Sequence, residues 1–341
     1  MRIFETKFLK EDLIDINKIL MSGLIGYGPK SSELEEKFFN FSKKQYNVSV
    51  NSASAAAFII FAYLKNKYGS CDVYTPSIGF TSPAWAAKHH GHNLIFVDVD
   101  ENMLMSMESY TEERRYRCER YSDGGIKPVL MPVLYGGVSF IPNLEKVVRQ
   151  DGYNEFVILD SAHCSTPTNT CDVSFFSFHP YKPIASSDGG MISTNIIDLE
   201  NFSKMYKNFG RENNKNGYEI TSEGFKFYMN DLNASIALTQ IERYKQNLDV
   251  RKQNFNNIQS KKLNGRLLPH DSNSSYYIAT LICETRGEAE EYRSIFCKDR
   301  LYPPLHKQSF YKQKYICDLK NTDSLYNRMV VMSRMRLSAA I

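Results

Sequence analysis

The 341-residue sequence lacks any apolar run of the length that spans a membrane, and its first residues, MRIFETKFLKED, lack the apolar core of a secretion signal. Its seven cysteines show no CxxC spacing of the metal-binding or redox type, which is typical of reduced thiols in the cytoplasm. The net charge is +4 and the basic residues are scattered, so no nucleic-acid-binding surface is indicated. These absences predict a cytoplasmic protein that binds neither membranes nor nucleic acids.

The sequence does contain an alternation of short apolar runs and helical patterns. Apolar strands separated by helices predict an α/β fold with a mostly parallel sheet that is covered on both faces. The predicted strands are 47–50, 73–75, 94–100, 129–135, 156–160, 173–178 and 190–195. The predicted helices are 8–20, 34–46 (with Ser31 or Ser32 as N-cap), 53–67, 83–90 and 143–150, and no element is predicted in the polar stretch 101–127.

The pattern changes after about residue 200. A loop rich in glycine and asparagine (210–217) precedes one long predicted helix over 231–251, then a strand within 272–283, a helix over 288–296 and a proline-rich loop over 301–310. This predicts two domains, a large α/β domain over 1–225 and a smaller α+β domain over 226–341. The N-terminal helix is a candidate to pack on the smaller domain.

Two charged residues stand where pyridoxal phosphate (PLP) chemistry needs them. Asp160 ends the apolar run FVIL, and Lys182 lies 22 residues later, between prolines in the segment SFFSFHPYKPIASSDGG. A lysine forms the Schiff base with PLP, and a carboxylate keeps the pyridine nitrogen protonated so that the ring can accept electrons. Taken singly, each of these residue types is more often a solvated surface charge.

A second informative stretch is the turn NSASAAAF at 51–58, between a strand and a helix. Small residues let the backbone approach a ligand, and the free amides of a helix N-terminus attract anions. Ser52 and Ser54 add hydroxyl donors, although serine and alanine are also common where a helix is simply capped. This turn, the loop 76–82, Asp160 and the Lys182 segment all follow strands, and ligands gather at the carboxyl ends of parallel strands.

Several motifs occur in the order of a known family: NSASAA, PSIGF, FVDVD, PVLYGG, LDSAH, SFHPYK with DGG, MNDLNASIALTQIER and PLHKQ. Over about residues 8–315 the sequence resembles the DegT-type (DegT/StrS) sugar aminotransferases, which are PLP enzymes of fold type I. The resemblance implies a large domain with a mostly parallel seven-stranded sheet and a smaller C-terminal α+β domain.

The resemblance assigns the residues around the PLP ring. It makes Lys182 the catalytic Schiff-base lysine and Asp160 the partner of the pyridine nitrogen. His163 falls beside the phenolic oxygen of the ring. Phe80 falls at the aromatic residue that stacks on the ring face, although a buried core phenylalanine is the alternative interpretation.

The resemblance also assigns phosphate and substrate contacts. Ser177, Ala53 and Ser54 fall at positions that bind the PLP phosphate through hydroxyls and amides. His306, in the PLHKQ motif, and Tyr181, next to Lys182, are assigned to the substrate pocket. A loop histidine without a role is the alternative for His306.

By this resemblance, the predicted reaction is PLP-dependent transamination of a keto nucleotide-sugar, with L-glutamate as amino donor, for amino-sugar or polysaccharide biosynthesis. The motif SFHPYKPI is closer to the branch that aminates C4 of 4-keto-6-deoxy sugars. A homodimer with shared active sites is expected. Two alternatives stay open: an aminotransferase for a small phosphorylated ketone such as dihydroxyacetone phosphate, and a PLP-binding sensor without catalysis.

The sequence departs from the family pattern in three places. Residues 224–228 read GFKFY where the family has Gly-x-Asn-x-Arg, so Lys226 is expected to replace that Asn at the PLP phosphate of the neighbouring subunit, with an ordinary surface lysine as the alternative. Residues 207–210 read KNFG where the family has Arg-Asn-His-Gly, which removes a polar contact to substrate. The sequence ends in MRLSAAI where the family continues into a further helix.

Overall fold

The computed structural model describes residues 9–10, 12–120, 126–148, 155–163, 166–214, 217–295, 301–312 and 318–334. The beginning of the helix predicted over 8–20, the end of the helix predicted over 143–150 and the terminal MRLSAAI lie outside the described residues. Within these ranges, none of the helices combines the length and the apolar character needed to cross a bilayer.

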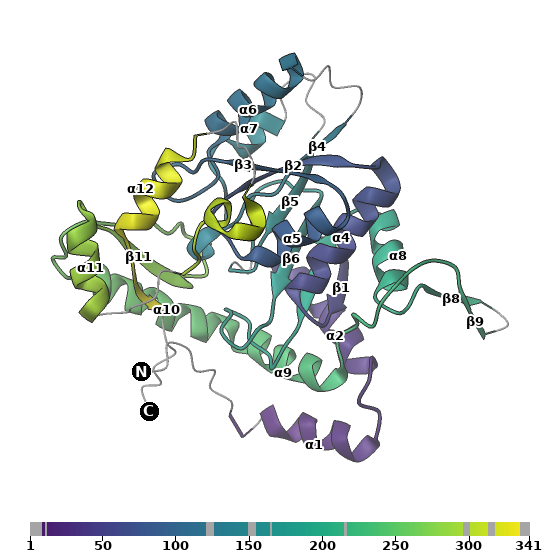
Figure 1. Ribbon diagram of the computed structural model, residues 1–341. Coiled ribbons are helices and arrows are strands. Elements are labelled where there is room, and N and C mark those ends of the chain that lie inside the picture. The colour runs from purple at the N-terminus through teal and green to yellow at the C-terminus, as the bar shows by residue number, and fades with distance from the viewer. Residues whose placement is uncertain are drawn as a thin grey trace.

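The large sheet has seven strands in the order β1-β7-β6-β5-β4-β2-β3 (Figure 1). Strand β7 runs antiparallel to β1 and β6, and the pairs from β6 to β3 are parallel. The predicted α/β fold with a mostly parallel seven-stranded sheet is therefore confirmed. The strands are β1 (Tyr46–Val50), β2 (Cys71–Pro76), β3 (Asn93–Val97), β4 (Lys127–Leu130), β5 (Phe156–Asp160), β6 (Val173–Ser177) and β7 (Gly190–Thr194).

Successive residues of these strands enter cores on opposite faces of the sheet. Val73 and Ile158 pack into one core, and their neighbours Tyr74 and Leu159 pack into the other. Because both faces are covered, the strands are apolar throughout rather than alternating. Helices α4 (Ala53–Tyr68), α5 (Thr81–His89) and α8 (Ile197–Tyr206) cover the first face, and α6 (Met107–Arg120) and α7 (Leu144–Val148) cover the second.

The N-terminal helices are held by a carboxylate distant in the sequence. Helix α2 (Pro29–Lys37) begins at Pro29, followed by α3 (Phe39–Ser42), so the predicted N-cap at Ser31 or Ser32 is wrong. The carboxylate of Asp231 instead accepts hydrogen bonds from the amides of Lys30 (3.1 Å) and Ser31 (2.9 Å). An anion at a helix N-terminus is favourable, so Asp231 fixes α2 against α9 (Asp231–Glu242).

The helix predicted over 231–251 is two helices, α9 and α10 (Tyr244–Gln259), which are separated at Arg243. Helix α9 packs on α1 (Asp12–Ser22) and α2, whereas α10 packs on a small antiparallel sheet. This sheet contains β10 (Arg266–Leu267), β11 (Ile278–Ile282) and β12 (Met329–Arg334), with α11 (Arg286–Ile295) and α12 (Lys320–Arg328) beside it. The boundary predicted between residues 225 and 226 stays a prediction.

Two further expectations are corrected by the structure. The polar stretch 101–127 contains α6, which anchors itself through the fully buried Tyr110 and the ion pair of Arg117 with Asp72 rather than through an apolar stripe. The predicted loop 210–217 forms part of a hairpin, β8 (Arg211–Asn214) with β9 (Gly217–Ile220). The hairpin extends away from the body of the molecule (Figure 1).

Candidate active site

A cavity of about 340 Å³ opens at the carboxyl ends of β1, β2, β5 and β6. This is the edge at which the sequence places its candidate residues, and β7 begins there because it runs in the opposite direction. Eight of the ten predicted site residues line the cavity: Ala53, Ser54, Phe80, Asp160, His163, Ser177, Tyr181 and Lys182. The other two, Lys226 and His306, are not among its described lining residues.

The N-terminus of α4 forms one end of the cavity. Ser52 caps the helix by accepting a hydrogen bond from the Ala55 amide at 3.1 Å, which leaves the amides of Ala53 and Ser54 in the first turn, where a helix supplies no acceptor. Gly190 lets β7 approach this turn, because a Cβ at position 190 would lie 2.7 Å from the Ala53 nitrogen. With Ser177 in the same lining, amides and hydroxyls converge as an anion-binding end.

Asp160 is held rigidly at the end of β5. Its amide donates to Pro132 O (3.0 Å), and its carbonyl accepts from the Leu134 amide (3.0 Å). Its Oδ1 accepts from the Ala162 amide at 3.0 Å. Burial raises the pKa of the Asp160 carboxyl to about 6, against the opposing effects of the Ala162 amide and the nearby Lys182. A cationic group facing this carboxylate would relieve the cost of burying its charge.

Lys182 is presented by a tight turn after β6. Its amide donates to His179 O at 2.9 Å, and the Ser186 amide donates to Phe178 O at 2.7 Å, so the segment folds back on itself before β7. The Lys182 Nζ lies 5.2 Å from the ring centroid of Tyr277. The lysine and Asp160 thus come from strands that are neighbours in the sheet.

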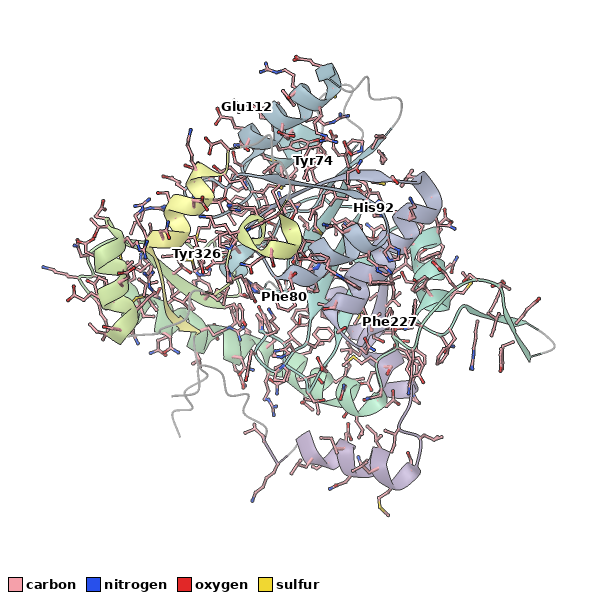
Figure 2. The ribbon with its side chains drawn as sticks, in the orientation of Figure 1. Tyr74, Phe80, His92, Glu112, Phe227 and Tyr326 are labelled. Carbon is pink, nitrogen blue, oxygen red and sulfur yellow. The ribbon has the colours of Figure 1, made fainter. Side chains whose placement is uncertain are left out.

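Aromatic rings form the rest of the wall. Phe80 is 53% exposed and lies near the centre of the molecule, by the yellow C-terminal turns (Figure 2). Its ring centroid lies 5.7 Å from that of Tyr302, which in turn lies 6.1 Å from that of His163. The His163 ring also lies 4.9 Å from Tyr277. Phe80 is therefore a cavity residue, and the alternative of a buried core phenylalanine does not hold.

Tyr277 and Tyr302 were not predicted from the sequence. Both line the cavity, yet they lie beyond residue 270, far from the motifs of the sheet edge. The sequence signal for Tyr302 is weak: a tyrosine followed by two prolines in a loop. Tyr277 directly precedes β11 of the small sheet, and Ser275, two residues earlier, donates from Oγ to His163 O at 2.6 Å. The position of Tyr277 in the cavity therefore depends on how the small sheet packs.

Lys226 and His306 lie apart from the cavity lining. The Lys226 carbonyl accepts from Asn51 Nδ2 at 3.1 Å, and its Nζ lies 5.7 Å from the Tyr228 ring centroid. His306 packs against Ser77, with its Nδ1 2.7 Å from Ser77 Oγ. The roles predicted for both residues, at the phosphate and in the substrate pocket, stay predictions.

The residues present fit PLP. The buried Asp160 carboxylate suits a protonated pyridine nitrogen, and the first-turn amides of α4 suit a phosphate. The rings of Phe80 and His163 line the same cavity, and Lys182 supplies the amine. A sheet of this order with this set of residues defines a PLP-dependent enzyme of fold type I.

Comparison with known proteins places the chain within that class. The model of the DegT/DnrJ/EryC1/StrS aminotransferase family matches residues 7–337, and the chain belongs to this family. Members of the family are PLP-dependent transaminases, so the predicted family and cofactor are confirmed.

Individual relatives agree with this assignment. The spore coat polysaccharide biosynthesis protein SpsC of Bacillus subtilis is 29% identical over 254 residues, a match that covers 69% of this chain and 62% of SpsC, less than two thirds of its length. Helicobacter pylori PseC, an aminotransferase involved in pseudoaminic acid biosynthesis, is 19% identical with a TM-score of 0.84, covering 97% of this chain and 93% of PseC. Streptococcus pneumoniae Spr1654 in its PMP form is 19% identical with a TM-score of 0.86, covering 100% and 95%. The two structures establish the fold.

Proposed function

We propose that the protein transfers an amino group from L-glutamate to the keto carbon of a nucleotide-linked sugar, with a 4-keto-6-deoxy hexose as the predicted acceptor. The observation that carries this proposal is the convergence of Asp160, Lys182 and the α4 N-terminus in one cavity. The family match and the description of SpsC in polysaccharide biosynthesis support a sugar acceptor.

The protein's own residues would hold the cofactor at three points. Asp160 would face the pyridine nitrogen, where its ionised form stabilises the proton on that nitrogen. Ser54, Ser177 and the amide of Ala53 would bind the phosphate. Phe80 would cover one face of the ring.

When bound, PLP supplies an electron sink that stabilises negative charge at the substrate carbon. Lys182 would then have two tasks: its amine would attach the cofactor, and once released it would act as the base that moves a proton from the substrate carbon. The turn from His179 to Ser186 keeps this amine in the cavity. The rings of Tyr277 and Tyr302 line the same cavity, where they would reduce the access of water and so strengthen the attraction between Lys182 and Asp160.

We further propose a homodimer. Helix α1 and the loop after it expose large apolar side chains, with Leu13 51%, Met21 88% and Leu24 75% exposed. Phe225, next to Lys226, is 48% exposed as well. Apolar surface of this extent is typical of an interface. In such a dimer Lys226 would reach the PLP phosphate of the partner subunit.

The cytoplasmic location of the protein remains a prediction.

The test begins with purified protein and added PLP. Borohydride reduction should add the cofactor mass to the peptide that contains Lys182, and L-glutamate should shift the absorbance of bound cofactor. A nucleotide-linked 4-keto sugar should then restore the spectrum, with a 3-keto sugar and dihydroxyacetone phosphate as the comparisons. Restoration by dihydroxyacetone phosphate alone would contradict a sugar acceptor, and a glutamate shift that no ketone reverses would favour the sensor.

A further inference from the structure

The C-terminal segment is anchored on the loop that carries Phe80. The Leu305 amide, in the turn η2 (Leu305–Lys307), donates to Ser77 O at 2.8 Å, and the His306 amide donates to Ser77 Oγ at 3.1 Å. The Ser77 Oγ also lies 2.7 Å from His306 Nδ1. Ser77 is fully buried, so these hydrogen bonds are protected from competition with water.

The hydrogen-bond directions in this anchor are mutually consistent. The Nε2 of His306 lies 3.3 Å from the Asp323 carboxylate, and the negative charge there favours the tautomer with its proton on Nε2. Nδ1 is then an acceptor for the Ser77 hydroxyl, whose oxygen accepts from the His306 amide. Burial lowers the pKa of His306 against the opposing charge of Asp323, with Lys307 and Asp98 also acting on the ring, and this favours the neutral form that the anchor requires.

A stiff link connects the anchor to the cavity. Pro303 and Pro304 separate Tyr302 from the anchored turn, and Pro304 has the extended backbone angles φ −53° and ψ 131°. Consecutive prolines have few accessible conformations, so a fixed Leu305 largely fixes Tyr302. The Tyr302 ring contacts Phe80 and His163, two residues assigned to the cofactor ring.

A second anchor lies on the other side of Phe80. The hydroxyl of Tyr311, in η3 (Ser309–Tyr311), lies 2.7 Å from Thr81 Oγ1 and donates to Thr81 O at 3.0 Å. Ser77 precedes Phe80 and Thr81 follows it directly. The loop that carries Phe80 is therefore held from both ends by residues 305–311.

We propose that His306 is a positioning residue, which holds Tyr302 against Phe80 through Ser77 so that the two rings set the angle of the bound cofactor. His306 thus acts on the site through Tyr302 rather than by touching substrate. This inference rests on the confirmed PLP dependence of the family, so it can be tested whether or not the acceptor is a nucleotide sugar.

The experiment measures cofactor binding by titrating apo protein with PLP, together with the circular dichroism of the bound cofactor, which reports its angle in the site. His306→Phe, which removes the acceptor, should weaken PLP binding about tenfold and change the dichroism. His306→Asn should restore both, because the Asn side-chain oxygen can accept from Ser77 in place of Nδ1. Lys320→Ala, which removes a surface ion pair with Asp318 that does not involve His306 or Asp323, is the control and should leave both readouts unchanged.

Tyr302→Ala should reproduce the effect of His306→Phe, and the double variant should lose no more than either single variant, since both changes remove the same ring contact. Thermal unfolding of each apo variant checks that the fold is kept. Losses that multiply in the double variant would overturn the proposal. Equal losses in His306→Asn and His306→Phe would overturn it as well, because the Ser77 hydrogen bond would then have no part in cofactor binding.

Discussion

The carboxyl edge of the large sheet and the segment 206–230 use their polar residues in opposite ways. At the edge, Asp160 and Lys182 line a cavity. In the segment, Lys207 is 3% exposed and its Nζ pairs with Glu35 at 2.8 Å, away from that cavity. The residues at the sheet edge are placed for catalysis, whereas Lys207 in the segment stabilises the fold of its own subunit. Lys226, in the same segment, is exposed on the surface of that subunit.

The backbone of the segment is correspondingly specific. Phe209 and Gly210 both have positive φ, 63° and 70°. A Cβ at Gly210 would lie 1.9 Å from Ser222 O, so only glycine fits there. The left-handed conformation at Phe209 costs about 1–2 kcal/mol, which the contacts of the surrounding segment must offset. The surrounding contacts therefore fix the backbone conformation of this segment. Its departures from the family pattern are compatible with a stable fold.

The largest effect on the edge should come from Lys182→Ala. We expect turnover to fall at least about 10⁴-fold, because both attachment of the cofactor and the proton transfer are lost. The free energy of unfolding should fall by only about 1 kcal/mol, because the buried Asp160 carboxylate loses a nearby positive charge. Steady-state kinetics and urea unfolding measure the two quantities, with Lys252→Ala, an exposed lysine on α10, as control. Residual turnover close to normal would assign the chemistry to another residue.

Lys207→Met should show the reverse behaviour. Removing one partner of a buried ion pair leaves the Glu35 charge uncompensated, so the free energy of unfolding should fall by about 3–5 kcal/mol. The double variant Lys207→Met/Glu35→Gln should recover much of this loss, because glutamine keeps an acceptor for the Ser49 amide without the charge. PLP affinity per folded molecule should not change. Urea unfolding that leaves Lys207→Met as stable as the starting protein would refute the structural role.

Asp160→Asn separates stability from function at the edge. The Asp160 carboxyl has a raised pKa of about 6 against an ordinary 3.8, so its burial cost is absent below about pH 4 and complete above pH 6. The difference corresponds to about 3 kcal/mol. Apo Asp160→Asn should therefore gain stability over the unmodified protein as pH rises from 4 to 7, while turnover falls about 10²–10³-fold. Unfolding at several pH values measures this, and a pH-independent difference would contradict it.

These contrasts also show what the sequence could predict. Asp160 and Lys182 follow apolar strands, and the topology of a parallel sheet brings such ends together without further information. Tyr302 could not be placed in this way, because its position depends on hydrogen bonds between residues 77 and 305–306, which are more than 200 positions apart. Helix α6 (Met107–Arg120) was not predicted because its buried side chains are few and mixed, Met107 and Tyr110 with the charged Glu113, and an ion pair of Arg117 with Asp72 adds to them.

The smallest expected effect tests whether the two regions meet across a dimer. Lys226→Met should weaken PLP binding about tenfold if the ammonium group binds the phosphate. The decisive measurement mixes this variant with Lys182→Ala and allows subunits to exchange. If Lys226 acts on the partner's site, about one quarter of the sites regain both lysines, since half of the dimers are mixed and one site in each is complete. If Lys226 acts within its own subunit, or not at all, mixing restores nothing beyond the sum of the separate activities.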